Sequence, residues 1–173
     1  MESQITLRPA DLVVALALAE RPEEPYEALS SRLYLSVGAV HGGVKRLRIA
    51  GLVIAGAKRV HRRNLVEFVM HGARYAFPGV TGPVAGGVPT AYSAPPLDQE
   101  IVFEEALVWP SIDGSMRGES LTPLYPGAPK LVRTAPTLYE VLALFDALRV
   151  GRARERSRAR ELLEQRLKPE RDE

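Results

Sequence analysis

Residues 35–53 of the chain, LSVGAVHGGVKRLRIAGLV, hold the pattern that decides the fold. Ser36 can cap a helix by accepting a hydrogen bond from a backbone N–H two or three residues later, and Gly51 can supply the left-handed residue that ends the helix. Between them, three large apolar residues recur at helical spacing: Val40, Val44 and Leu47. The stretch therefore predicts a helix with one buried apolar face, followed directly by a short strand.

The opposite face of this predicted helix is basic. Its polar residues are His41, Lys45, Arg46 and Arg48. A second basic run follows: Lys58, Arg59, Arg62 and Arg63. Residues 36–75 hold eight Lys and Arg against one Glu, a net charge of +7, whereas the whole chain has a net charge of +2. Because phosphate contacts release counterions, charge concentrated in this way favours a polyanion, and we expect double-stranded DNA as the partner. The alternative is a solvated basic face.

The composition is that of an ordinary globular protein, with 46% apolar and 25% charged residues. The absence of cysteine excludes disulfides, zinc ribbons and thiol catalysis, and it is typical of a cytoplasmic protein. The apolar run Leu12–Ala19 is too short to cross a bilayer, so we expect a buried helix there and no membrane partner.

Residues 1–75 are predicted to form a winged helix-turn-helix domain around the basic helix. Three further helices are expected in it, at Pro9–Glu20, Tyr26–Leu33 and Asn64–Tyr75, the last with Asn64 as its cap. The wing, a pair of short strands after the basic helix, is expected at Leu52–Ala55 and Lys58–Val60.

Two adjacent glycines, Gly42 and Gly43, lie in the middle of the basic helix. Each costs the helix about 1 kcal/mol relative to alanine, so a packing or functional reason is expected. For Gly43 we expect that it allows another helix to approach closely. For Gly42 the alternative is a close approach of the DNA backbone, which the sequence does not favour over other reasons.

The rest of the chain divides into two further segments. Residues 76–136 contain ten prolines and seven glycines, so long helices are not expected before residue 136. Short strands are predicted at Ile101–Phe103, Leu107–Trp109 and Met116–Leu121, with an Asp113-Gly114 hairpin signal before the last. Residues 136–173 are predicted to form helices at Thr137–Val150 and Arg152–Leu167. The expected fold class is mainly α with a small β component: a winged head at 1–75, an irregular segment at 76–135, and C-terminal helices.

The helix predicted at Thr137–Val150 carries a wide apolar stripe. Its residues are Leu138, Val141, Leu142, Phe145 and Leu148, with a second patch at Leu163 and Leu167. We expect the protein to form a homodimer through this stripe, because it is wider than a short helix needs within its own domain. Four arginines follow at spacings of three or four and are expected to share one face: Arg149, Arg152, Arg156 and Arg160. They would face an acidic surface or phosphate, or be solvated.

The sequence lacks the common catalytic and metal-binding motifs. It has no GxSxG, no phosphate-binding loop ending in GK[ST] and no dinucleotide fingerprint. The three histidines are not at the spacing of a local metal site, and all lie in the basic segment, which repels cations: His41, His61 and His71. We therefore expect no enzyme activity, no metal and no cofactor.

The pattern over residues 9–60 resembles the winged helix-turn-helix of MarR-like regulators. The matching residues are Leu29, Leu35-Ser36, Val40, Val44, Leu47 and Gly51-Leu52-Val53. The resemblance implies a DNA-binding transcriptional regulator whose third helix enters the major groove. It places Ser36 near a phosphate and Arg46 at a base or the backbone. Lys58 and Arg59 would meet the flanking minor groove or backbone. The residues that would meet the base edges are Gly38, Ala39, His41, Gly42 and Lys45. The charge pattern adds Arg62 and Arg63 as DNA contacts.

A second function is consistent with the same sequence. The head would then belong to an antitoxin-like or protein-docking module, and residues 76–135 would bind a co-encoded partner protein. Fold alone does not decide between these functions.

Overall fold

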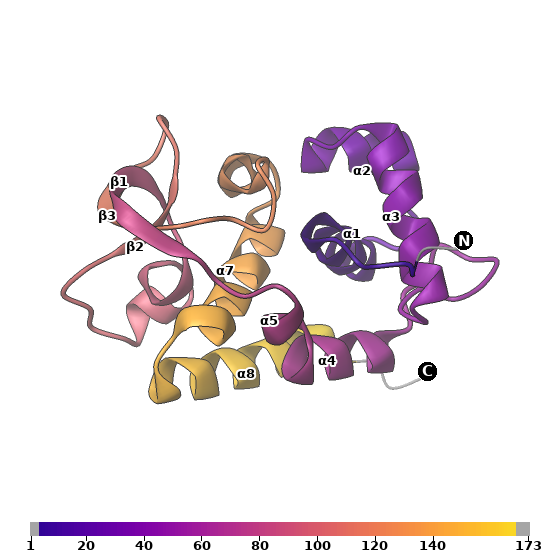
Figure 1. Ribbon diagram of the computed structural model, residues 1–173. Coiled ribbons are helices and arrows are strands. Elements are labelled where there is room, and N and C mark those ends of the chain that lie inside the picture. The colour runs from indigo at the N-terminus through magenta and orange to yellow at the C-terminus, as the bar shows by residue number, and fades with distance from the viewer. Residues whose placement is uncertain (1–3, 169–173) are drawn as a thin grey trace.

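Helix α1 (Pro9–Glu20) lies at the centre of the computed structural model, which describes residues 4–168 (Figure 1). Every residue from Asp11 to Ala19 is buried, because the sequence DLVVALALA is apolar around almost its whole circumference. Helix α1 packs against α3 (Val37–Ile49) on one side and against α7 (Pro136–Val150) on another. The buried helix expected at Pro9–Glu20 is confirmed, and one continuous apolar core runs through the molecule.

The main helices within the predicted head, residues 1–75, are α1, α2 (Tyr26–Leu33), α3 and α4 (Arg62–His71). The register predicted for α3 is confirmed, because the apolar face of that helix is fully buried: Val40, Val44 and Leu47. The Ser36 hydroxyl accepts a hydrogen bond from the backbone N–H of Ala39 at 3.1 Å, as a cap should. Gly51 has a φ of +72°, the left-handed conformation expected after the helix.

The end of the head differs from the prediction in two ways. The two wing strands are reduced to a single antiparallel bridge between Val53 and Val60. The helix expected at Asn64–Tyr75 begins earlier and is interrupted at Gly72, giving α4 and a short α5 (Ala73–Ala76). Asn64 is not the cap of α4: its side-chain amide donates instead to the Gly51 carbonyl at 2.8 Å. The His61 imidazole is the acceptor at the start of α4.

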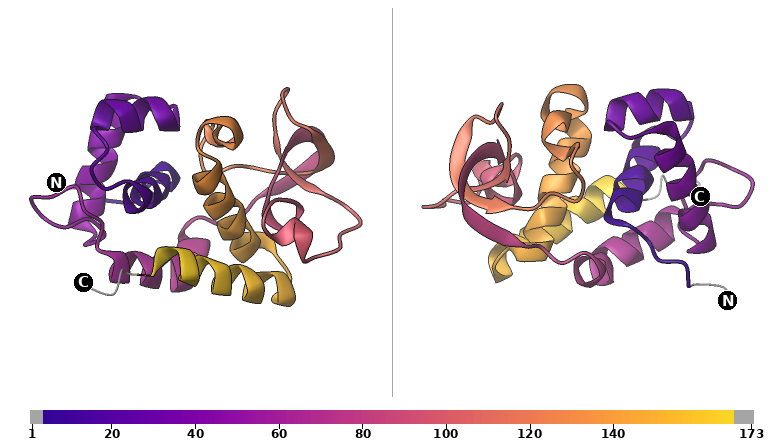
Figure 2. Two further views of the ribbon diagram at one scale, coloured as in Figure 1. Left: turned by 180° about the vertical axis from the view of Figure 1, so that it is seen from behind. Right: turned by 45° about the horizontal axis from the view of Figure 1, so that its top comes forward.

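A small closed sheet lies beyond α7, on the side away from the head (Figure 2). Its strands are β1 (Thr81–Pro89), β2 (Leu107–Pro110) and β3 (Met116–Leu121). Strand β1 runs antiparallel to both others, pairing with β3 along its first part and with β2 along its last, so β2 and β3 pair in parallel. The hairpin predicted at Asp113-Gly114 is therefore wrong, since a hairpin joins antiparallel strands.

Short turns of helix connect these elements. The 3-10 turns are η1 (Ala91–Ser93), η2 (Leu97–Gln99) and η3 (Ala128–Lys130), and the α-helical one is α6 (Leu131–Thr134). The strand predicted at Ile101–Phe103 is absent: this segment is irregular, and the Val102 side chain is fully exposed at 99%. The strands predicted at Leu107–Trp109 and Met116–Leu121 are confirmed as β2 and β3.

Helices α7 and α8 (Ala153–Leu167) are confirmed, but the apolar stripe is not a free surface. Helices α1 and α8, the turn η1 and other elements of the same chain pack on α7. As a result, the five residues of the stripe and the two of the second patch are each 8% exposed or less: Leu138, Val141, Leu142, Phe145, Leu148, Leu163 and Leu167. The expectation of a dimer interface at this stripe is thereby overturned. No helix within residues 4–168 is long and apolar enough to span a membrane.

A buried polar cluster joins α7 to the sheet. The Asp146 carboxylate, fully buried, accepts hydrogen bonds at 2.7 Å from the Thr90 hydroxyl and from the indole N–H of Trp109. Its other oxygen pairs with the Arg149 guanidinium at 2.6 Å. The Arg149 side chain is thus buried, and α7 ends at Val150, whereas Arg152 is the N-cap of α8, so the four arginines predicted to share one helix face do not do so.

Candidate nucleic-acid interface

The outer face of α3 is open to solvent. Because Val40, Gly43, Val44 and Leu47 turn toward the core, the residues between them turn outward. Five of the residues predicted to contact DNA are exposed on this face: Ser36, Gly38, Ala39, His41 and Lys45. The structure therefore brings these five positions together on one face, as a partner surface requires.

Arg46 does not present a free guanidinium on this face. Its Nε and Nη2 atoms each donate to one oxygen of Asp11, both at 2.7 Å, and Asp11 is only 2% exposed. The same carboxylate accepts from the backbone N–H of Arg8 at 2.8 Å. The hydrogen bond with Asp11 raises the pKa of Arg46. This pair corrects the expectation that Arg46 is available to a base, and it fixes α3 against α1.

The close contact between α3 and α1 occurs at Gly43. A Cβ atom on Gly43 would lie 3.0 Å from an oxygen of Asp11, so only glycine fits without displacing that carboxylate. The packing role expected for Gly43 is confirmed. At half-buried Gly42 a Cβ atom would meet only the guanidinium end of Arg46, with the Nη1 atom at 3.3 Å.

Two further predicted contact residues turn toward the protein. The Lys58 ammonium donates to the Glu24 carbonyl at 3.1 Å and lies 5.4 Å from the ring centre of Tyr26. The Arg62 guanidinium donates to the Ala19 carbonyl, at the end of α1, at 2.7 Å. Both side chains are half-buried, so they connect the wing and α4 to the rest of the head.

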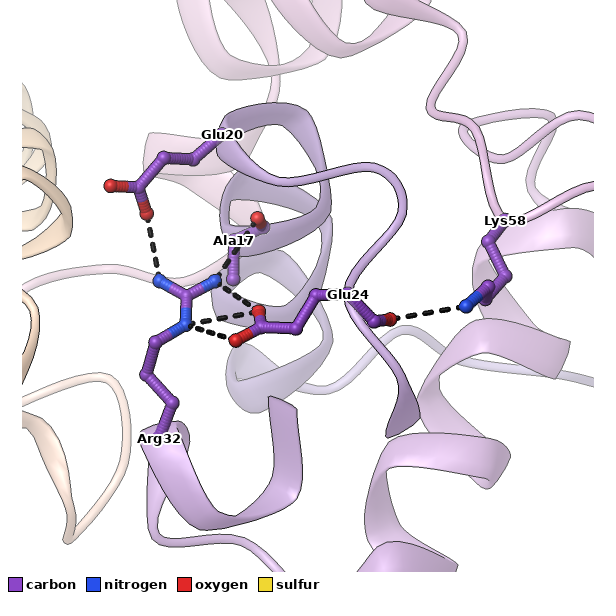
Figure 3. A network of polar contacts seen from close by, with 5 residues as sticks. All are labelled: Ala17, Glu20, Glu24, Arg32 and Lys58. Atoms are coloured by element: carbon purple, nitrogen blue, oxygen red, sulfur yellow. Dashed lines mark hydrogen bonds and ion pairs between the residues drawn. The ribbon is translucent and has the colours of Figure 1, made fainter. Parts of the chain in front are cut away.

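Helix α2 is fixed by a network that the sequence patterns did not predict (Figure 3). The Arg32 guanidinium, only 7% exposed, pairs with Glu20 at 2.8 Å and with Glu24 at 2.6 Å. It also donates to the Ala17 carbonyl at 3.3 Å. Since Lys58 binds the Glu24 carbonyl, one network holds α1, α2 and the wing in a fixed relation.

Four basic residues in and after α3 are exposed to solvent: Lys45, Arg48, Arg59 and Arg63. Arg59 and Arg63 are exposed, and Arg48 reaches the Ala57 carbonyl of the wing at 3.1 Å. Lys45 and Arg63 form no ion pair with any residue of 4–168. Lys45 and Arg63 therefore carry positive charge that no carboxylate of residues 4–168 neutralises.

The segment before α1 borders the same face. A shallow groove of about 460 Å³ separates residues 4–8 from the outer side of α3. Its polar lining includes Gln4, Thr6, Arg8 and Lys45. The sequence patterns did not predict that this segment flanks α3, because it has no periodicity.

Within the described part of the chain, no three or more His, Cys, Asp or Glu side chains come together as a metal site requires. His41 instead packs edge-on against Tyr26, with 4.5 Å between ring centres.

No family model matches the chain, and no significant match was found among the curated proteins or among the solved structures.

Proposed function

We propose that the head is a winged helix-turn-helix related to that of MarR-like regulators, and that the protein is a DNA-binding transcriptional regulator. The observation that supports this most is the open outer face of α3, which carries Lys45, together with the exposed Arg63 in the first turn of α4. Helix α3 is held on its inner side by the Asp11–Arg46 pair, so its orientation is fixed before any partner binds. An ordered helix with unneutralised charge is what insertion into a major groove requires.

The proposed contacts differ in kind. Lys45 and Arg63 would meet phosphates, Ser36 would approach the backbone, and Gly38, Ala39, His41 and Gly42 would lie nearest the base edges. The face lacks Asn and Gln, the side chains that read adenine through two hydrogen bonds. Electrostatic contacts therefore dominate the proposed binding, and its affinity should fall steeply with salt.

The test is a salt titration of binding to a mixed-sequence DNA duplex. The double variant Lys45→Gln/Arg63→Gln should bind more weakly, and the slope of log K against log salt should flatten by about 0.9 for each phosphate that the variant no longer neutralises. Arg154→Gln is the matched control, because Arg154 is an exposed arginine on α8. An unchanged affinity and slope in the double variant, with its circular dichroism intact, would contradict the proposal.

A second candidate function is that of an antitoxin-like or protein-docking module, in which residues 76–135 bind a co-encoded protein. What favours it is apolar side chains left exposed in this segment: Val80, Val84, Val102 and Ile112. A stable protein complex isolated from the native host, with no protection of DNA, would favour this candidate. A homodimer on a palindromic site remains part of the first proposal, although the stripe on α7 no longer supplies its interface.

A further inference from the structure

A groove of about 340 Å³ lies where four helices of the molecule converge. It is lined by the end of α1, the first residue of α4, the first turn of α7, and the end of α8. Its floor is apolar and is formed by Leu16, Leu138, Val141 and Leu167. This volume is at the lower end of the range for small-molecule sites, and an apolar lining with a few polar groups is their usual character.

The polar groups around this groove are mostly cationic. Arg62, Arg166 and Lys168 line it, and Glu20 is the one carboxylate among its lining residues. The Glu20 carboxylate is already engaged by Arg32 at 2.8 Å. Arg62 and Lys168 have no ion-pair partner among residues 4–168. The groove therefore has an excess of positive charge beside an apolar surface.

One donor at the groove is left without an acceptor. The Nη2 atom of Arg166 pairs with the Glu140 carboxylate at 2.6 Å, but its Nη1 atom is buried and has no hydrogen-bond partner in the described chain. A buried charged donor without an acceptor is unfavourable, and an incoming oxyanion would satisfy it once the Arg166 side chain, which is 29% exposed, turns this atom toward the groove. This is the observation that points to a ligand and not only to a surface depression.

We infer that the groove binds a small organic anion, whose carboxylate or phosphate group lies at Arg166 with Arg62 and Lys168 nearby. Its apolar body would lie on Leu138 and Val141. Such a ligand would touch the head through α1 and α4 and the C-terminal helices through α7 and α8. The inference stands independently of DNA binding.

The test is calorimetric titration of the full chain, without DNA, with four probes. Octanoate and octyl phosphate carry the two candidate head groups, octan-1-ol has the apolar body without charge, and inorganic phosphate has the charge without the body. We expect at least one of the two anionic probes to bind about tenfold more tightly than octan-1-ol and than inorganic phosphate. The stronger of the two anionic probes identifies the head group. Binding by neither anionic probe, or equal binding of octan-1-ol, would overturn the inference.

Variants of α8 locate the site. Arg166→Gln should weaken binding of the better probe about tenfold, because it removes the charge-assisted hydrogen bond. Lys168→Gln, at the exposed end of α8, should weaken it several-fold without any effect on folding. Arg158→Gln is the control, since Arg158 lies on the same helix but pairs with Glu100 and Glu161 away from the groove. Parental affinity in both Arg166→Gln and Lys168→Gln would contradict the proposed site.

Discussion

Gly42 and Gly43 are neighbours in sequence and in helix α3, yet their surroundings differ. Gly43 is buried against Asp11, whose carboxylate is held by Arg46 and by the backbone of Arg8 and so cannot move away. A Cβ atom on Gly42 would meet only the Nη1 end of Arg46, which is not one of the two nitrogen atoms that bind Asp11. The same substitution should therefore have opposite effects at the two positions.

Gly42→Ala should raise the free energy of unfolding by up to about 1 kcal/mol, the helix propensity gained. Gly43→Ala should lower it by about 1–3 kcal/mol, because the added methyl group overpacks the contact with Asp11. Urea unfolding followed by circular dichroism measures both values. If the Gly43→Ala variant were as stable as the Gly42→Ala variant, the result would contradict the close contact between α1 and α3 at Gly43.

The basic character of the segment could be predicted from the sequence. The hydrogen-bond or ion-pair partner of each basic side chain could not. Lys45 and Arg46 are adjacent in one predicted helix, but only Arg46 lies within reach of a buried carboxylate, Asp11, 35 residues earlier in the chain. Lys58 and Arg62 likewise find backbone carbonyls of α1 and of the loop that follows it. Such pairings depend on tertiary contacts, and a helical period carries no information about them.

Among the elements, the helices agree closely with the prediction from the sequence, whereas the sheet does not. Helices α1, α3 and α7 have caps, breakers or apolar periods that belong to single stretches of chain. Strand β1 includes Pro83 and three glycines, which are unfavourable in strands, and it forms only because β2 and β3 pair with it. The Asp113-Gly114 pair is a common hairpin signal, but pairing with β1 overrides it.

Arg32 ties α2 to the end of α1 and to the loop that follows it. Arg32→Gln should lower the free energy of unfolding by about 3 kcal/mol, because it leaves two carboxylates, Glu20 and Glu24, without their common partner. Arg158→Gln is a fair comparison, since Arg158 also pairs with two carboxylates but is 36% exposed. That variant should lose less than about 1 kcal/mol. Equal losses, measured by urea unfolding, would show that the Arg32 network contributes no more than a surface pair.

At the scale of the whole molecule, two buried tyrosines connect stability to alkaline pH. Burial raises the pKa of Tyr139, whose hydroxyl donates to the Pro89 carbonyl at 2.7 Å, and it raises the pKa of Tyr125. A folded-state pKa above the unfolded value gives stability that is complete below the unfolded pKa, about 10 for tyrosine, and is lost as the pH rises through the folded value.

The free energy of unfolding should therefore decline above about pH 10. Tyr125→Phe/Tyr139→Phe should flatten this decline, even though it removes the hydrogen bond to Pro89. Urea unfolding at several alkaline pH values measures the parent protein and the double variant, and an unchanged decline in the double variant would contradict the assignment.

The central place of α1 has a consequence for synthesis of the chain. Helix α1 ends at Glu20, and α7, which covers one side of it, begins only at Pro136. At translation rates of about 5–20 residues per second, the intervening segment takes on the order of ten seconds to emerge. During that time the most apolar helix of the molecule has no partner on one side, so this apolar side is exposed to association with other chains until α7 is complete.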